Sequence, residues 1–347
     1  MFWIVGAEDV VHALHKLSDT GPIRLLADQM DHKPWAGFAF YDLIFPMFVF
    51  MVGVSLVFSL GRLVEREGRF GAVKRLGRRA LLMYILGLFY YGGFSTPIDH
   101  IRLLGVLQRI AIAYFFAGLA FCYLGNRGRA TLLVSLLLGY WALMSFVPVP
   151  GFGAGDFAEG HNLANWIDKQ YLPWRKWDGD HDPEGLLSTF PAIGTCLLGM
   201  FAGILIQGGK VTANRIPTYL AMAGVGLACT GWLWNIQFPV VKKLWTSSFV
   251  LVAGGYSCLF LATFYYLIEV KKWQKWAQPF VWIGMNPITI YMLHNMLDLQ
   301  KLGARFVGGD VGIALGRGAS LASTVVVMLL SILFCRFLYR RQIFLRL

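Results

Sequence analysis

The stretch YDLIFPMFVFMVGVSLVFSLG, residues 41–61, decides the fold class of this chain. Its only charged side chain is Asp42, at the second position. About 20 apolar residues in a row are enough for a helix to cross the ~30 Å hydrocarbon core of a bilayer. The stretch therefore predicts a membrane-spanning helix.

Eight further apolar runs follow along the chain. They lie at residues 80–94, 104–124, 131–148, 187–207, 217–237, 247–269, 279–297 and 318–338. The opening residues 1–11 resemble a tenth span whose first part is missing, so we expect the natural start to lie upstream. We predict an all-α, polytopic integral membrane helix bundle of about ten spans. It would form one domain over residues 1–347, with an outward loop at about 149–186.

The composition excludes a water-soluble globule. Of the 347 residues, 57% are apolar and 14% are charged, whereas a soluble domain has roughly 45–50% apolar residues, glycine included, and about 25% charged residues. The five cysteines all lie within predicted spans, with neither a CxxC pair nor a zinc-like spacing. We therefore expect buried thiols, no disulfide and no metal.

The net charge of +12 is distributed unevenly between alternate loops. One set of segments carries about +15, and the rest of the chain carries about −3. This set consists of the loops at 62–79, 125–130, 208–216 and 270–278 and the tail from Arg336, together with Glu269. By the positive-inside rule, the basic loops and the C-terminus are cytoplasmic. Basic loops lying on anionic lipid explain the charge, so the bilayer is the expected partner and nucleic acid is not.

Polar residues stand out near the outward ends of the spans. Glu8 and His12 share a face of the opening helix because they are four residues apart. His32 lies on a loop that Pro34 stiffens, and histidine can exchange a proton near neutral pH. Asp42 heads the span at 41–61, where a carboxylate is also expected as a helix cap.

Three more polar groups occur further along the chain. Arg109, next to Gln108, lies inside an apolar helix and should pair with an acid, Asp42 or Glu8. Asp182 and Glu184 follow a loop rich in aromatic residues, a combination that suits a sugar or an amine. The remaining candidates are Asn286 before the helix-breaking Pro287, and His294 within reach of Asp298. Each of these groups also has a purely structural interpretation, as an ion pair, a solvated loop or a buried packing network.

The run HKPWAGFAFYDLIFPMFVFMVGVSLVFSL, residues 32–60, is similar to the motif H-x-x-W-x-G-x-x-x-x-D-L-x-F-P-x-F-x-F-x-x-G-x-S. That motif belongs to the heparan-alpha-glucosaminide N-acetyltransferase family and its bacterial relatives. Three more runs resemble further stretches of that family, in the same order. They are IRLLGVLQRIAIAYF, HDPEGLLSTFPAIGTCLLGMFAG and WIGMNPITIYMLHNM. The resemblance implies a membrane enzyme of the bacterial inner membrane. Such an enzyme would move acetyl from cytoplasmic acetyl-CoA to an amino sugar or a sugar hydroxyl on the periplasmic side, and a homodimer is possible.

The resemblance also implies roles for single residues. His32 would be the catalytic histidine, acting as base or carrying the acetyl group, with Asp42 or Glu8 orienting its ring. The chain reads GAED where the human-type enzyme has an assisting asparagine, so Glu8 or Asp9 would occupy that region. The substrate-binding candidates are Trp35, Gln108, Arg109, Asp182, Glu184, Asn286 and His294. The candidates for the phosphates of acetyl-CoA are Lys74, Arg75, Arg78 and Arg79.

Two other functions fit the same sequence. A transporter of a sugar or an amine would use the same polar cavity without chemistry, although the two halves share no evident repeat. A membrane scaffold would use the polar residues only for packing. Dependence on acetyl-CoA separates the enzyme from both.

Overall fold

The fold is known from a computed structural model that describes residues 2–95, 97–209, 211–296 and 299–344. These residues form helices and connecting loops, and no β-strand longer than an isolated bridge occurs among them. The prediction of an all-α membrane protein is confirmed. Seven helices in this part of the chain are long and apolar enough to cross a membrane.

The chain divides into two compact units. The first contains residues up to His32, Ala39–Ile44 and residues from Lys272 onward. The second contains Lys33–Phe38 and Phe45–Lys271, and it holds most of the long helices.

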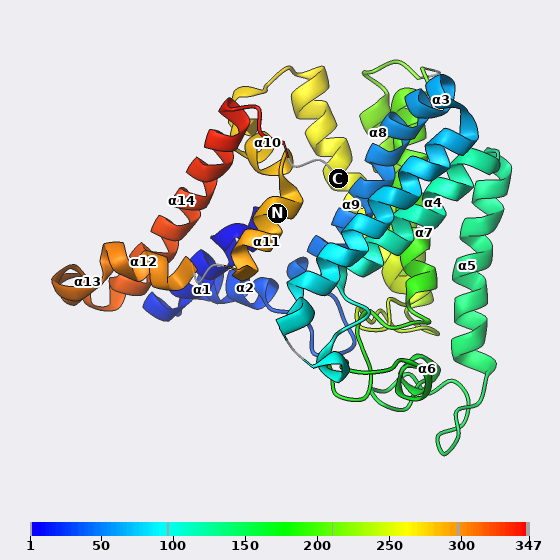
Figure 1. Cartoon of the computed structure of the whole chain (residues 1–347), viewed down its shortest axis with the longest axis horizontal. Helices are drawn as coiled ribbons and strands as arrows, with labels where there is room; N and C mark the ends of the chain where they lie inside the picture. The colour runs from blue at the N-terminus through cyan, green and yellow to red at the C-terminus, as the bar shows by residue number, and fades with distance from the viewer. Residues whose placement is uncertain (1, 96, 210, 297–298, 345–347) are drawn as a thin grey trace. The chain divides into compact units, whose positions relative to one another are not determined.

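The second unit is a helical bundle with a loop region at one end (Figure 1). Its helices are α3 (Ile44–Tyr90), α4 (Val106–Tyr123), α5 (Asn126–Phe146), α6 (Leu163–Tyr171), α7 (Thr189–Gln207), α8 (Ile216–Trp234) and α9 (Ser247–Tyr265). Each of the spans predicted at 104–124, 131–148, 187–207, 217–237 and 247–269 corresponds to one of these helices.

Helix α3 covers most of two predicted spans, 41–61 and 80–94, on either side of a break at Gly68. Gly68 has φ +72°, a conformation that favours glycine because it has no Cβ. Ser59 and Arg79 line the same small cavity although twenty residues separate them, a distance of about 30 Å along a straight helix. The chain therefore turns back at Gly68, and α3 makes two passes.

Close helix packing in this bundle depends on small residues. A Cβ added at Gly53 of α3 would lie 1.9 Å from the carbonyl oxygen of Cys196 in α7, and one added at Gly199 would lie 1.8 Å from that of Phe50. The two backbones touch directly, as small residues permit in membrane helices.

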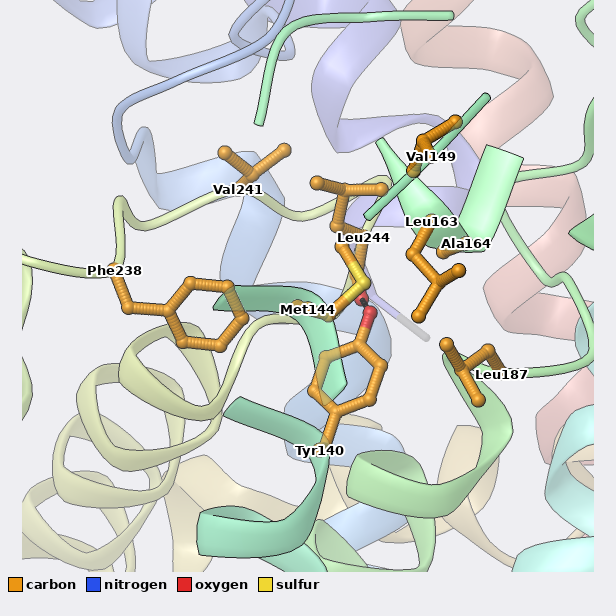
Figure 2. Packing of buried hydrophobic residues seen from close by; sticks show 9 residues of the cluster. All are labelled: Tyr140, Met144, Val149, Leu163, Ala164, Leu187, Phe238, Val241 and Leu244. Carbon is orange, nitrogen blue, oxygen red and sulfur yellow. Dashed lines mark hydrogen bonds between the residues drawn. The ribbon is translucent and has the colours of Figure 1, made fainter. Parts of the chain in front are cut away.

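The predicted outward loop at 149–186 packs on a hydrophobic cluster at one end of this bundle. Figure 2 shows its members: Tyr140, Met144, Val149, Leu163, Ala164, Leu187, Phe238, Val241 and Leu244. The buried Tyr140 hydroxyl donates to the carbonyl oxygen of Leu244 at 2.6 Å, so the single polar atom of this ring is satisfied. The loop is therefore a packed part of the second unit.

The first unit is built from short helices and one long helix, α14. These are η1 (Trp3–Ala7), α1 (Glu8–Leu17), α2 (Gly21–Met30), η2 (Phe40–Leu43), α10 (Gln278–Gly284), α11 (Pro287–Met296), α12 (Leu299–Val307), α13 (Gly309–Leu315) and α14 (Ala319–Arg340). The span predicted at 318–338 is α14. The run predicted at 279–297 is interrupted before Pro287, as the proline requires, and gives α10 and α11. Neither these two helices nor the opening segment is among the seven long helices.

The cysteine prediction was correct at four positions of five. Cys122, Cys196, Cys258 and Cys335 are buried, but Cys229 is exposed on α8. An apolar run alone does not indicate which face of a helix packs inward.

Candidate active site

His32 and Asp42 come together in the first unit. His32 Nδ1 lies 2.8 Å from Asp42 Oδ1, and the His32 side chain is 51% exposed whereas that of Asp42 is fully buried. A carboxylate at Nδ1 favours the tautomer that carries its proton there. Nε2 then has the lone pair that a general base needs.

The second carboxylate oxygen of Asp42 is held by the backbone. Asp42 lies in η2, directly before α3, and its Oδ2 accepts the Ala39 N–H at 3.0 Å. The prediction that Asp42 caps this helix start is confirmed. One oxygen thus fixes the carboxylate, and the other faces the imidazole, as in the orienting acid of a catalytic triad.

Tyr41 and Glu8 lie next to this pair. The Tyr41 hydroxyl donates to Glu8 Oε2, and the centroid of its ring is 4.8 Å from that of His32. Glu8 is the first residue of α1, while Tyr41 belongs to η2. The structure thus brings Glu8, which we predicted as part of the site, to Tyr41, which we did not single out.

In the second unit, Asp182 and Glu184 bind Arg102. The Arg102 Nε and Nη2 atoms donate to Asp182 at 2.8 and 2.6 Å, and Nη2 also donates to Glu184 at 2.5 Å. The guanidinium is 3% exposed and lies 4.6 and 5.0 Å from the ring centroids of Tyr91 and Trp177. The two acids predicted for substrate binding therefore form a buried ion cluster. Arg102 is the only Lys or Arg in the loop 93–103, the one signal that could have drawn attention to it.

Arg109 has a partner within the second unit that we did not predict. It is 1% exposed, its Nη2 donates to the Ser188 hydroxyl, and its guanidinium lies 4.9 Å from the Trp245 ring centroid. The ion pair with Asp42 or Glu8 stays a prediction, because those acids belong to the first unit and Arg109 to the second. Among the described residues, Nε and Nη1 of Arg109 have no hydrogen-bond acceptor. These two donors are suited to a ligand oxygen.

Gln108, the neighbour of Arg109, is also fully buried. Its Nε2 donates to the Arg102 carbonyl oxygen at 3.4 Å, and its Oε1 has no donor among the described residues. A Cβ at Gly87 would lie 2.3 Å from that Oε1, so only glycine leaves room for the amide.

Asp168 in α6 is a buried acid that the sequence did not single out. Its carboxylate accepts the N–H groups of Leu186 at 2.9 Å and Asp182 at 3.3 Å. Burial raises the pKa of Asp168 to about 6, although those two hydrogen bonds oppose the rise. Asp168 thereby holds the DPEG segment that carries Asp182 and Glu184.

The other substrate-binding candidates are spread over both units. Trp35 Nε1 donates to the Phe157 carbonyl oxygen at 2.9 Å in the second unit. In the first unit, the buried Asn286 donates to the Ile343 carbonyl oxygen at 3.0 Å, and His294 is half-buried in α11. The predicted partner of His294, Asp298, lies outside the described residues.

Two of the four basic residues predicted for acetyl-CoA line a cavity of about 130 Å³ in the second unit. Its walls are Ser59, Leu60, Leu63, Arg75, Leu76, Arg79 and Tyr114. Arg75 and Arg79 are four residues apart and face it together, whereas Lys74 and Arg78 do not line it. Guanidinium and hydroxyl groups around a small cavity fit a phosphate.

Glu159, Asp178 and His181 also lie close together, with one possible metal-ligand atom each within 4.8 Å of the others. The Lys243 ammonium, however, is 3.0 Å from Glu159 Oε1 and 2.9 Å from Asp178 Oδ2. Although burial opposes it, these two carboxylates raise the pKa of Lys243 and keep it charged. The lysine thus supplies the cation between the two acids.

Comparison with known proteins places the chain in a family. The family described as heparan-alpha-glucosaminide N-acetyltransferase, catalytic, matches residues 10–231, a range that contains His32, Asp42 and Arg109. The human heparan-alpha-glucosaminide N-acetyltransferase is 27% identical over an alignment of 331 residues, covering 77% of this chain and 49% of the relative. The mouse protein of the same name is 26% identical over 334 residues, with the same coverage. The chain spans about half the length of these relatives. Because the family match covers more than half of the chain, this protein belongs to the heparan-alpha-glucosaminide N-acetyltransferase catalytic family.

Proposed function

We propose that this protein is a membrane acetyltransferase that moves acetyl from acetyl-CoA to the amine of an amino sugar or to a sugar hydroxyl. The observation that carries the proposal is the His32–Asp42 pair, with Nδ1 and Oδ1 2.8 Å apart and the carboxylate fully buried. The names of the relatives support an amino sugar as acceptor.

In the direct route, His32 Nε2 takes a proton from the acceptor while the acceptor nitrogen or oxygen attacks the thioester carbon. The carbon–sulfur bond then breaks, and the thiolate leaves and takes up the proton. Asp42 stabilises the imidazolium formed in between. In the two-step route, Nε2 itself attacks the thioester and carries the acetyl group to the acceptor.

The donor would bind at the basic end of the second unit. The cavity lined by Arg75, Arg79, Ser59 and Tyr114 offers cationic and hydroxyl donors to a phosphate of acetyl-CoA. This end belongs to the loops that the charge distribution assigns to the cytoplasm. With that orientation, we place the protein in a bacterial inner membrane.

The acceptor would bind at the opposite, periplasmic loops. Tyr171, Trp174 and Trp177 are exposed there, next to the acidic DGDHDPEG segment. Aromatic faces beside acceptor oxygens suit the apolar face and the hydroxyl or ammonium groups of an amino sugar. The unpartnered Nε and Nη1 of Arg109 are further donors for a substrate oxygen.

The test uses purified protein in detergent, acetyl-CoA and a panel of amino sugars, with release of free thiol as the readout. His32→Ala should abolish release, and Asp42→Asn should lower kcat by about 10²–10⁴-fold. The matched control is His100→Ala, because His100 is an exposed histidine on another loop.

Two results would contradict the proposal. One is thiol release that survives His32→Ala. The other is absence of release with every acceptor while vesicles accumulate a labelled sugar, which would favour the transporter. Trapping labelled acetyl on the His32 peptide after a short incubation without acceptor separates the two-step route from the direct one.

A further inference from the structure

Tyr41 links two groups of the candidate site in the first unit. Its hydroxyl donates to Glu8 Oε2 on α1, and its ring lies 4.8 Å from the His32 ring with an interplanar angle of 41°. Tyr41 and Asp42 are consecutive residues of the short helix η2. The Tyr41 ring lies beside the imidazole at a tilt, and Asp42 binds the imidazole Nδ1.

We propose that Tyr41 is a positioning residue that transmits the effect of Glu8 to His32. The inference rests on the proposed acetyl transfer for its kinetic consequence. It extends that function by assigning a role to a residue outside the H-x-x-W and D-L-x-F-P positions.

The physical need for such a residue comes from the exposure of His32. A side chain that is 51% exposed lacks protein packing over about half of its surface, so its ring keeps rotational freedom. A neighbouring aromatic ring reduces this freedom, because aromatic pairs have preferred geometries. Tyr41 can serve in this way only if its own ring is fixed.

Glu8 fixes the Tyr41 ring. A hydrogen bond from a phenol to a carboxylate is charge-assisted and stronger than one between neutral groups. Tyr41 is half-buried, so this bond is partly shielded from water. Glu8 thus anchors the hydroxyl end of the ring that lies beside His32.

The proposal predicts a graded series of variants. Tyr41→Phe keeps the ring and loses the bond to Glu8, so kcat should fall about 3- to 10-fold. Tyr41→Leu loses both, and kcat should fall about 100-fold. The KM for acetyl-CoA should stay within a factor of two in both variants, because this region is not proposed to bind the donor. Glu8→Gln retains a neutral acceptor for the hydroxyl and should recover most of the activity lost in Glu8→Ala.

A second readout does not depend on acetyl transfer. Diethylpyrocarbonate modifies accessible neutral imidazole, and mass spectrometry reports the rate on the His32 peptide. That rate should rise at least threefold in Tyr41→Leu, relative to the rate at exposed His100 in the same sample. Tyr219→Phe, which removes a hydroxyl from an exposed tyrosine on α8, is the matched control and should change neither readout.

The two readouts separate the possible failures. If wild-type protein shows no transfer but the His32 modification rate responds to Tyr41→Leu, the proposed function fails and the positioning role stands. If His32→Ala abolishes transfer while Tyr41→Leu changes neither kcat nor the modification rate, the positioning role is overturned. Equal loss of kcat in the Phe and Leu variants, with unchanged modification, would also overturn it, since only the ring contact differs between them.

Discussion

Replacing Arg102 by methionine should destabilise the second unit strongly. The side chains of Arg102 and Asp182 are 3% and 0% exposed, and that of Glu184 is 11% exposed. Methionine would leave two buried carboxylates without their cation. Removal of one partner from a buried ion pair lowers the free energy of unfolding by about 3–5 kcal/mol.

The surface pair Arg75–Glu67 provides the scale for comparison. Its atoms are 3.4 Å apart, and its side chains are 54% and 45% exposed. Exposed pairs contribute about 0–1 kcal/mol, so Glu67→Gln should cost less than 1 kcal/mol. The loss of stability in Arg102→Lys should lie between those of Arg102→Met and Glu67→Gln. Lysine keeps the charge but cannot form the bidentate hydrogen bond.

The assay is unfolding of detergent-solubilised protein by a rising fraction of SDS, followed by tryptophan fluorescence. Trp177, whose ring lies 5.0 Å from the Arg102 guanidinium, is one of the twelve tryptophans that contribute to this signal. The triple variant Arg102→Met, Asp182→Asn, Glu184→Gln tests whether charge is the cause, and it should recover at least half of the loss. A loss below 1 kcal/mol in Arg102→Met, or a triple variant as unstable as the single one, would refute this reasoning.

Three further outcomes are expected. Because the pKa of Asp168 is raised to about 6, the folded state holds a proton that the unfolded state releases near pH 4. The contribution of Asp168 to the free energy of unfolding is therefore greatest below pH 4. It falls by about 3 kcal/mol as the pH rises from about 4 to above 6. Asp168→Asn should remove that slope, and parallel pH curves for the two proteins would contradict it. Gly53→Ala should cost about 1–3 kcal/mol in the same SDS assay, because its Cβ would lie 1.9 Å from the Cys196 carbonyl oxygen. Gly139→Ala on α5, which meets nothing within 4 Å, should be neutral or slightly stabilising. Arg75→Ala with Arg79→Ala should raise the KM for acetyl-CoA at least tenfold, whereas Lys74→Ala with Arg78→Ala should change it less than threefold; equal effects would contradict the cavity assignment.

Most of the helices could be predicted from the sequence because each is encoded locally. A run of apolar residues identifies a span, and Pro287 marks the break between α10 and α11. The reversal inside α3 is harder to predict, since Gly68 lies in a polar stretch that continues as helix on both sides.

The contacts of the site were predictable only in part. His32 and Asp42 are ten residues apart, within one motif, and the structure pairs them. Arg102 and Asp182 are 80 residues apart, and no periodicity connects them. The partner of Arg109 was missed for the same reason, because Ser188 is 79 residues away and carries no charge to suggest a pair.

The exposed Cys229 makes α8 open to chemical mapping of its environment. It is the one exposed thiol among the five cysteines, and α8 is long and apolar enough to cross a membrane. In intact membranes, a charged maleimide confined to water should not label this position, because the reactive thiolate does not form in apolar surroundings. The same reagent should label it once SDS has dissolved the bilayer. A single native thiol can therefore report whether one helix face is covered by acyl chains, without any engineered label.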